Sequence, residues 1–221
     1  MSVTTTWAAI FDFDGVLVDS ALCHRWSWEK LAEEEGKLLL EGSFEKGFGR
    51  RNAYIIPKIL QWTEEAEEVA RLSKRKEELY REFICEKGIE PLPGVVPWLE
   101  KLQENKIPCV IGSSTDRLNL EVVLKEAGID QFFDQFVSAE DVTIGKPDPE
   151  VFLKGAEKIG IKPERCVVFE DALVGIEAAH AAGMKVVAVA TSHPAEKLGE
   201  ADRVVNRLDE LSVEEIRNLV T

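Results

Sequence analysis

The chain has 221 residues, enough for one ordinary domain with a smaller inserted domain but too few for three domains. Hydrophobic residues make up 45% of it, which supports a packed core and argues against disorder. The 41 acidic and 27 basic residues give a net charge of −14, and the aromatic residues are not interleaved with basic ones. We therefore expect neither nucleic acid nor an anionic membrane as a partner.

The predicted strands recur along the chain with helices between them. They are expected near residues 7–12, 107–113, 134–138, 165–170, 185–190 and 203–206. Several are near-continuous apolar runs, which is typical of strands buried on both faces of a parallel sheet. Helical periodicity between them ends at Gly128, Gly160 and Gly183. This alternation predicts an α/β protein, a three-layer α/β/α Rossmann-like parallel sheet with ligands at the carboxyl ends of its strands.

One region interrupts the alternation. Residues 19–92 contain helical stretches around 56–60 and 69–83 and no convincing strand. We interpret the charge run at 64–78 as a solvated helix face, and we expect three tryptophans to pack in this region's core, namely Trp26, Trp28 and Trp62. The sequence thus predicts a core domain, 1–18 and 93–221, with an inserted helical domain, 19–92, that can close over a site as a lid.

Compartment and assembly are indicated by what the sequence lacks. No apolar run is long enough to span a bilayer, and the first residues do not have the pattern of a signal peptide. The four cysteines are far apart and form no C-x-x-C pair. We expect a reduced, cytoplasmic, monomeric protein without a zinc site.

The segment FDFDGVLVDS at residues 11–20 is the most informative stretch of the chain. Asp12 and Asp14 follow an apolar strand, and side chains two positions apart on a strand share a face. Gly15 then allows a sharp turn. Two close carboxylates repel each other, so either a cation lies between them or one of them holds a proton. Either arrangement indicates a reactive site.

This segment resembles the first motif of the haloacid dehalogenase superfamily of phosphohydrolases. Three further motifs of that superfamily resemble later segments, in order: Ser113 in IPCVIGSST, Lys146 in IGKPDPEVF, and Glu170 with Asp171 in CVVFEDALVGIEAAHAAGM. With its helical insert, the chain resembles subclass I of the superfamily, whose inserted domain is a helical cap, and within it the β-phosphoglucomutase and sugar-phosphatase group.

The resemblance implies a role for each matching residue. Asp12 would attack phosphorus and form an aspartyl-phosphate, and Asp14 would be the general acid and then the general base. Lys146 would neutralise Asp12 and the phosphoryl oxygens, while Ser113, with Ser114 beside it, would bind one of those oxygens. Taken alone, Ser113 would equally suit a helix N-cap, and Lys146 would suit a surface turn.

The resemblance also implies a Mg²⁺ cofactor. Its protein ligands would be the Asp12 carboxylate, the Asp14 backbone carbonyl and the Asp171 carboxylate, with Glu170 near the metal or a metal-bound water. The family often has another aspartate a few residues later. Here the corresponding stretch is ALVG, which includes Gly175.

In the insert, His24 could orient Asp14 or be structural. Arg50 and Arg51, in GFGRRN, lie where cap loops of the family approach the substrate, although two solvated arginines would look the same. Lys76 also resembles a cap position that reaches the site in some relatives, but its charged surroundings, KRKEEL, predict that it is exposed.

We therefore predict a Mg²⁺-dependent phosphatase that hydrolyses a small phosphorylated metabolite, in particular a sugar phosphate. A β-phosphoglucomutase-like mutase is the alternative. Asp14 argues against dehalogenase chemistry, and the cap offers no apolar-flanked lysine for the Schiff base of a phosphonatase. The order of elements argues against a receiver domain. A binding module that has lost activity would be expected to lack one of the motif residues.

Overall fold

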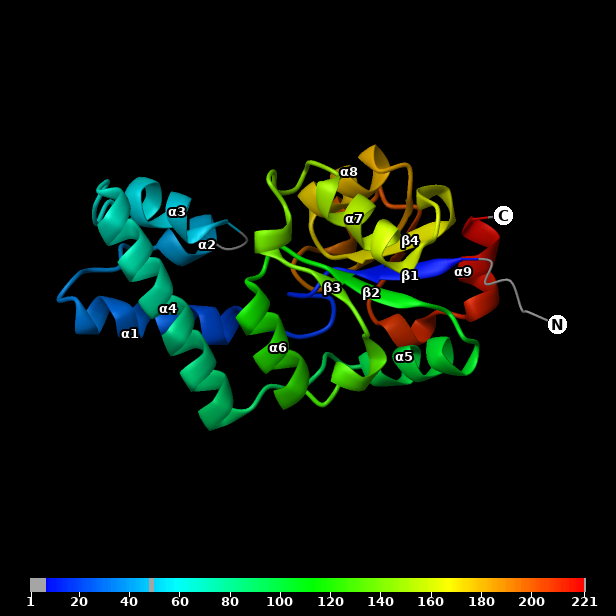
Figure 1. Cartoon of the computed structure of the whole chain (residues 1–221), viewed down its shortest axis with the longest axis horizontal. Coiled ribbons are helices and arrows are strands. Elements are labelled where there is room, and N and C mark those ends of the chain that lie inside the picture. Colours follow the sequence, from blue (N-terminus) through cyan, green and yellow to red (C-terminus); the bar gives the residue numbers. More distant parts are fainter. Residues whose placement is uncertain (1–6, 48–49, 221) are drawn as a thin grey trace. The chain divides into compact units, whose positions relative to one another are not determined.

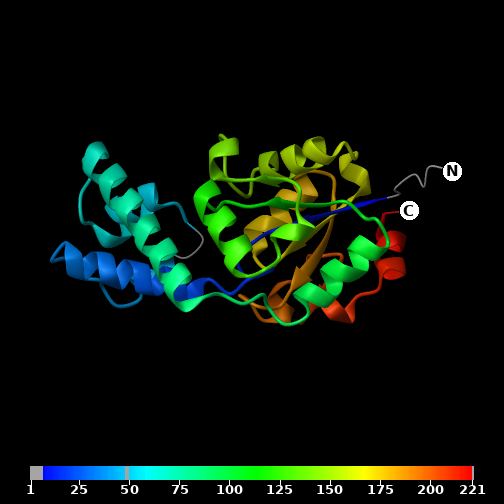
Figure 2. The ribbon, with the colours of Figure 1, turned by 60° about the horizontal axis from the view of Figure 1, so that its bottom comes forward.

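The computed structural model describes residues 7–47 and 50–220, and the chain divides into two compact units. The core unit comprises Met1–Asp19 and Glu90–Thr221. The helical unit comprises Ser20–Ile89. The chain thus leaves the core unit shortly after its first strand and returns to it before the helix that precedes the second strand (Figure 2).

A parallel sheet is the centre of the core unit. Among the described residues it has six strands, in the spatial order β3-β2-β1-β4-β5-β6. The strands are β1 (Ala8–Phe11), β2 (Cys109–Gly112), β3 (Phe136–Val137), β4 (Cys166–Glu170), β5 (Lys185–Val189) and β6 (Arg203–Val205). All six predicted strand positions are confirmed, and so is the parallel α/β class.

Helices cover both faces of the sheet, with α7 and α8 on one face and α5 and α6 on the other (Figure 1). The helices of the core unit are α5 (Val95–Glu104), α6 (Arg117–Glu126), α7 (Glu150–Ile159), α8 (Leu173–Ala181) and α9 (Val213–Leu219). Five short 3-10 helices lie in its connections: η2 (Asp130–Phe132), η3 (Ala139–Asp141), η4 (Pro163–Arg165), η5 (Ala195–Lys197) and η6 (Leu208–Glu210).

The two helical layers pack against alternate strand residues. Ile10 of β1 belongs to one buried cluster with Phe152 of α7 and Ile176 of α8. On the opposite face, the ring of Phe169 of β4 contacts the ring of Trp98 on α5, with the ring centroids 6.0 Å apart. Because successive strand side chains point to opposite faces, a sheet covered on both sides requires apolar residues at every position. This explains the continuous apolar runs in the sequence.

The predicted helix ends are also confirmed. Gly128, Gly160 and Gly183 have φ values of 65°, 66° and 73°, in the left-handed region that glycine adopts without a steric penalty. Each follows the helix that the periodicity predicted, namely α6, α7 or α8.

The strand order places a reversal point between β1 and β4. The chain moves outward on one side through β2 and β3 and on the other through β5 and β6. In sheets of this kind the ligand site lies beyond the carboxyl ends of the strands at that point. The backbone there is regular, because the N–H of Asp12 donates to the carbonyl oxygen of Phe169 at 2.9 Å.

The helical unit packs around its own apolar cluster. Its elements are α1 (Ala21–Glu34), α2 (Ser43–Gly47), α3 (Asn52–Tyr54), the π-helix η1 (Ile55–Leu60) and α4 (Ala66–Lys87). Trp28, Leu31, Ile56 and Leu72 are among its buried residues. Trp26 and Trp62 pack against the same cluster, so the three predicted core tryptophans are confirmed.

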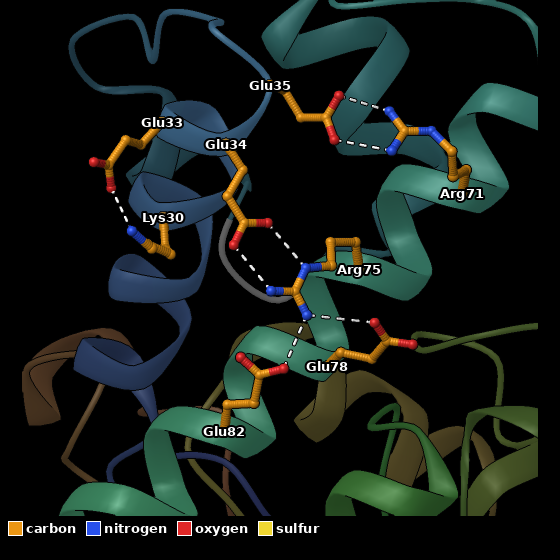
Figure 3. A network of polar contacts seen from close by, with 8 residues as sticks. All are labelled: Lys30, Glu33, Glu34, Glu35, Arg71, Arg75, Glu78 and Glu82. Atoms are coloured by element: carbon orange, nitrogen blue, oxygen red, sulfur yellow. Dashed lines mark hydrogen bonds and ion pairs between the residues drawn. The ribbon is translucent and has the colours of Figure 1, made fainter.

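Ion pairs join α1 to α4 on the surface of this unit (Figure 3). Arg71 donates to both carboxylate oxygens of Glu35 at 2.6 and 2.9 Å, and Arg75 donates to both oxygens of Glu34 at 2.9 Å. Each arginine is bidentate to one glutamate and pairs with others as well, Arg71 with Glu68 and Arg75 with Glu78 and Glu82.

The interpretation of residues 64–78 as a wholly solvated face is wrong at two positions. Lys76 is only 2% exposed and Glu77 only 8%. Lys76 lies four residues after Leu72 and four before Tyr80, on the stripe of α4 that is buried. Helical spacing therefore overrides the charged neighbourhood, and the expected exposure of Lys76 is corrected.

All four cysteines carry free thiols. Burial raises the pKa of the Cys109 thiol to about 12, and burial followed by the negative charge of Glu164 does the same for Cys166. Across the described residues, no helix is both long and apolar enough to cross a membrane.

Candidate active site

The loop after β1 presents the two aspartates of the first motif. Asp12 follows the strand directly and is 8% exposed. A tight turn follows, closed by the N–H of Gly15 donating to the carbonyl of Val18 at 2.8 Å. Gly15 has a φ of +80°, and a Cβ there would lie 2.0 Å from an Asp171 carboxylate oxygen. Glycine is therefore required both by the backbone conformation and by the close approach of Asp171.

Lys146 reaches this loop from the segment that precedes α7. Its Nζ lies 2.6 Å from Oδ1 of Asp12 and 2.5 Å from Oε1 of Glu170, and its side chain is 8% exposed. The alternative of a surface lysine in a turn is therefore wrong. Burial alone would lower the pKa of the Lys146 ammonium, but the charges of Asp12 and Glu170 outweigh burial and raise it above its usual range.

Glu170 and Asp171 lie at the end of β4. One carboxylate oxygen of Glu170, Oε2, accepts the backbone N–H groups of Asp171 and Ala172 at 2.7 and 2.8 Å. A Cβ at position 175 would lie 1.8 Å from its other oxygen. Gly175, found where the family often has an aspartate, therefore provides the space that the Glu170 side chain occupies.

Three carboxylates meet at this edge of the sheet. Asp12, Glu170 and Asp171 each offer an oxygen atom, and these oxygens all lie within 4.8 Å of one another. Burial raises the pKa of Asp12 to about 7, against the opposing charge of Lys146 and with Glu170 and Asp14 adding to the rise. Burial, then the charges of Glu170 and Asp12, raise the pKa of Asp171 to about 8. Buried, crowded oxygen ligands are the donor set that Mg²⁺ prefers, so these residues fit that ion.

The loop after β2 brings hydroxyl groups to the same edge. Ser113 is buried, and its Oγ accepts the backbone N–H of Thr115 at 3.1 Å, which leaves its proton to donate. Ser114 is exposed beside it. The hydroxyl of Thr115 donates to Oδ2 of Asp14 at 2.5 Å. Ser113 is not the N-cap of the next helix, because α6 begins after Asp116.

Sequence reasoning missed the residues that hold the loop before Lys146. Oε2 of Glu150 accepts the backbone N–H groups of Thr143 and Ile144 at 2.8 and 3.0 Å. Lys154 donates to Glu150 at 2.6 Å and to the carbonyl of Asp141 at 2.5 Å. Hydrogen bonds from Lys154 and from these backbone groups lower the pKa of Glu150 to about 2. The only signal in the sequence was that Glu150 lies in the segment IGKPDPEVF, which carries Lys146.

Two further hydroxyl groups were also missed, and both belong to the loop after β5. A Ser192 hydrogen bond opposes the rise in the pKa of Asp171. The hydroxyl of Thr191 donates to the carbonyl of Gly15. Neither residue lies in a recognisable motif, so only the fold identifies them.

In the helical unit, His24 and Lys76 form a buried polar cluster. Nδ1 of His24 lies 2.6 Å from Nζ of Lys76, which also donates to Glu77 at 2.9 Å. Asn52 donates to the same Glu77 oxygen at 2.7 Å. The insert therefore does contain a buried lysine, contrary to expectation. Its ammonium contacts His24 and Glu77.

The two insert arginines are exposed. The guanidinium of Arg50 lies 4.8 Å from the ring centroid of Tyr54. A contact between Arg50 or Arg51 and a substrate stays a prediction.

The chain and its fold have counterparts among known proteins. Residues 8–183 match the family model described as haloacid dehalogenase-like hydrolase. The chain therefore belongs to the haloacid dehalogenase-like hydrolases.

Two of the relatives that the chain resembles are phosphatases. The chain is 40% identical to a chloroplastic 5-amino-6-(5-phospho-D-ribitylamino)uracil phosphatase of Arabidopsis thaliana, over 96% of this chain and 57% of the relative. It thus spans little more than half of that protein. It is 32% identical to a fructose-1-phosphate phosphatase of Escherichia coli, over 81% of this chain and 94% of the relative.

Solved structures match nearly the whole chain. A β-phosphoglucomutase from Clostridium difficile superposes with a TM-score of 0.83 at 31% identity, covering 96% of both chains. A family IA hydrolase from Entamoeba histolytica superposes with a TM-score of 0.87 at 28% identity, covering 97% of this chain and 99% of the other.

Proposed function

We propose that the protein is a Mg²⁺-dependent phosphatase that hydrolyses a small phosphorylated metabolite, a sugar or polyol phosphate, through an aspartyl-phosphate on Asp12. The observation that carries this proposal is the pairing of Asp12 with Lys146 at 2.6 Å, in a buried site with Asp14 two residues away. A buried nucleophile, a fixed cation and a nearby acid are what phosphoryl transfer requires.

In the first step an Asp12 oxygen attacks phosphorus. A bond forms between them as the bond from phosphorus to the leaving oxygen breaks, and Asp14 gives a proton to that oxygen. Lys146 balances the charge on Asp12 and on the phosphoryl oxygens, and the Ser113 hydroxyl donates to one of those oxygens. In the second step Asp14 takes a proton from water, which attacks phosphorus and releases phosphate and free Asp12.

The carboxylates of Asp12 and Asp171 and the backbone carbonyl of Asp14 would hold the Mg²⁺ ion, with Glu170 beside them. When bound, Mg²⁺ would neutralise negative charge on the phosphoryl group. The donor set supports this proposal, because three carboxylates share one small volume and Lys146 pairs with two of them.

The names of the relatives support the substrate class. They include phosphatases for fructose 1-phosphate, hexitol phosphates, phosphorylated carbohydrates and a phosphoribityl aminouracil. These compounds share a phosphate monoester on a hydroxylated carbon chain. We infer the same class here, with the helical unit as a cap that carries His24, Arg50 and Arg51 toward the substrate. We also propose a monomeric, cytoplasmic enzyme.

A β-phosphoglucomutase-like activity is the second candidate, favoured by the structural likeness to such an enzyme. A mutase must hold a bisphosphate and so needs a second cationic site. After Ser113, Asp116 adds negative charge, and Arg117, the first residue of α6, already donates to both oxygens of Asp141 at 2.8 Å. These contacts favour the phosphatase.

The test is phosphate release from a panel of sugar and polyol phosphates, with and without a chelator. The panel includes 5-amino-6-(5-phospho-D-ribitylamino)uracil and β-glucose 1-phosphate, the latter with a trace of its 1,6-bisphosphate. We expect Mg²⁺-dependent phosphate release from at least one compound. Rapid formation of glucose 6-phosphate with little free phosphate would favour the mutase, and full activity after exhaustive chelation would remove the metal from the mechanism.

A further inference from the structure

A hydrogen bond links the loops after β1 and β2 within the core unit. The Thr115 hydroxyl donates to Oδ2 of Asp14 at 2.5 Å, although the two residues are 101 positions apart in the sequence. No motif in the sequence singled out Thr115. The contact is among the shortest between side chains in the core unit, and short bonds to a carboxylate are typical of charge-assisted hydrogen bonds.

The backbone holds Thr115 firmly in place. Its N–H donates to the Ser113 hydroxyl at 3.1 Å, and its carbonyl accepts the N–H of Ala139 at 3.0 Å. The segment it contacts is fixed in turn, since the backbone N–H and the hydroxyl of Ser138 both donate to one oxygen of Asp141, at 2.8 and 2.9 Å. The position of the Thr115 hydroxyl is therefore set by the fold.

The backbone of Asp14 is held as well. Asp14 forms a bridge with Val18, next to the hydrogen bond that closes the turn between Gly15 and Val18. With its backbone set by this turn, the orientation of the carboxyl group depends on its χ angles. A hydroxyl at 2.5 Å from one oxygen restricts those angles and makes the two oxygens inequivalent.

We infer that Thr115 is a positioning residue for Asp14, one that assigns Oδ2 to the Thr115 hydroxyl and proton transfer to the other oxygen, Oδ1. This inference rests on the proposed function, in which Asp14 protonates the leaving group. As the phosphorus–oxygen bond breaks, the leaving oxygen takes the bonding electron pair and the proton from Oδ1. Thr115 keeps its own proton and continues to donate to the carboxylate that results.

The leaving group provides a test that a purely structural role would not reproduce. An alkoxide leaves poorly without a proton, whereas p-nitrophenolate is stable and leaves without one. Losing the orientation of a general acid should therefore affect a sugar or alkyl phosphate far more than p-nitrophenyl phosphate. Both esters need the nucleophile, Lys146 and the metal equally, so damage to those groups lowers both rates.

The experiment measures kcat/KM for the best sugar phosphate and for p-nitrophenyl phosphate, at saturating Mg²⁺. We expect Thr115→Val, which has nearly the same shape, to lower kcat/KM for the sugar phosphate about 10- to 100-fold, at or below the lower end of the range of about 100- to 10,000-fold for a whole general acid. The value for p-nitrophenyl phosphate should fall less than about threefold. Thr115→Ser should restore both, and Thr115→Ala is a second variant without the hydroxyl.

A double-mutant comparison completes the test. In an Asp14→Asn background, Thr115→Val should have no further effect on the sugar phosphate, because the acid it positions is gone. Equal losses for both substrates, or an undiminished loss in the Asp14→Asn background, would overturn the positioning role alone. A wild-type protein that releases phosphate from neither substrate would overturn the proposed function, and this inference with it.

Discussion

Replacing Gly175 with alanine should disable the site although alanine is the better helix former. Gly175 lies in the first turn of α8, and its φ is not in the left-handed region. Intrinsic helix propensity alone therefore predicts that Gly175→Ala raises the free energy of unfolding by up to about 1 kcal/mol. The added methyl group, however, would lie 1.8 Å from Oε1 and 1.9 Å from Cδ of Glu170. That carboxyl group is 1% exposed and has little room to move.

The expected magnitude follows from the bonds that Glu170 makes. Its oxygens accept from Lys146 and from the backbone N–H groups of Asp171 and Ala172. Hydrogen bonds to a charged group contribute about 1.5–3 kcal/mol each, so losing two of the three costs about 3–6 kcal/mol. When the gain from helix propensity is subtracted from this cost, the free energy of unfolding should fall by about 2–5 kcal/mol. Turnover should fall at least about tenfold, because Lys146 loses a partner that positions it.

The assay is urea denaturation of Gly175→Ala beside a matched glycine on another helix of the core unit. Gly155 of α7 is also helical, but a Cβ there would meet Ile10 and Val110 at 3.5 Å, an ordinary contact distance. Gly155→Ala should change stability by no more than about 1 kcal/mol and leave activity intact. Wild-type stability and activity in Gly175→Ala would refute the argument that Glu170 fills this space.

Three further outcomes are expected. Asp12→Asn should abolish turnover while circular dichroism stays native, because the amide keeps the shape but is a poor nucleophile; near-wild-type activity would sink the assignment. Lys146→Ala should lower kcat/KM on the order of 100-fold or more, and a loss below tenfold would mean that the lysine does not stabilise the transferred group. Glu77 has its pKa lowered from 4.5 to about 2, because Lys76, His24 and Asn52 together outweigh its burial. The stabilisation that the charged Glu77 provides is present above 4.5, the pKa of this group in the unfolded chain, and is lost as the pH falls toward 2. In urea denaturation, Glu77→Gln should therefore lower the free energy of unfolding by about 2 kcal/mol more at pH 7 than at pH 3. A pH-independent effect of Glu77→Gln would contradict the ion pair.

The fold could be predicted because its strands are short apolar runs and its helices end at glycines. A parallel sheet with crossover helices brings the carboxyl ends of its strands to one edge, so Asp12 and Asp171 had to lie near each other once their strands were recognised. Lys146 follows no strand, and the loop that precedes it is held by Glu150 and Lys154. Hydrogen bonds of this kind, between a side chain and a loop backbone, leave no periodic signal in a sequence.

The predicted exposure of Lys76 was wrong for a different reason. Its charged neighbours suggested a solvated face, yet its spacing from Leu72, Leu79 and Tyr80 matches the apolar stripe of an amphipathic helix. The spacing was visible in the sequence, and in the folded protein it decides the burial of Lys76 more than the charge of the neighbouring residues does. What could not be read from the sequence is the contact with His24, 52 positions away, whose Nδ1 lies 2.6 Å from the Lys76 ammonium.

The charges at the ends of β1 and β4 explain why so acidic a protein would need a cation to bind a phosphate. The chain has a net charge of −14, and at the site, among the described residues, Lys146 pairs with two of the three clustered carboxylates, Asp12, Glu170 and Asp171. The pKa values of about 7 for Asp12 and about 8 for Asp171 reflect burial and this mutual repulsion. A phosphate dianion entering here would meet an excess of negative charge unless protons or a cation offset it. In the proposed reaction a divalent cation is therefore needed for binding the phosphate as well as for transferring it, since protonating Asp12 would remove the nucleophile.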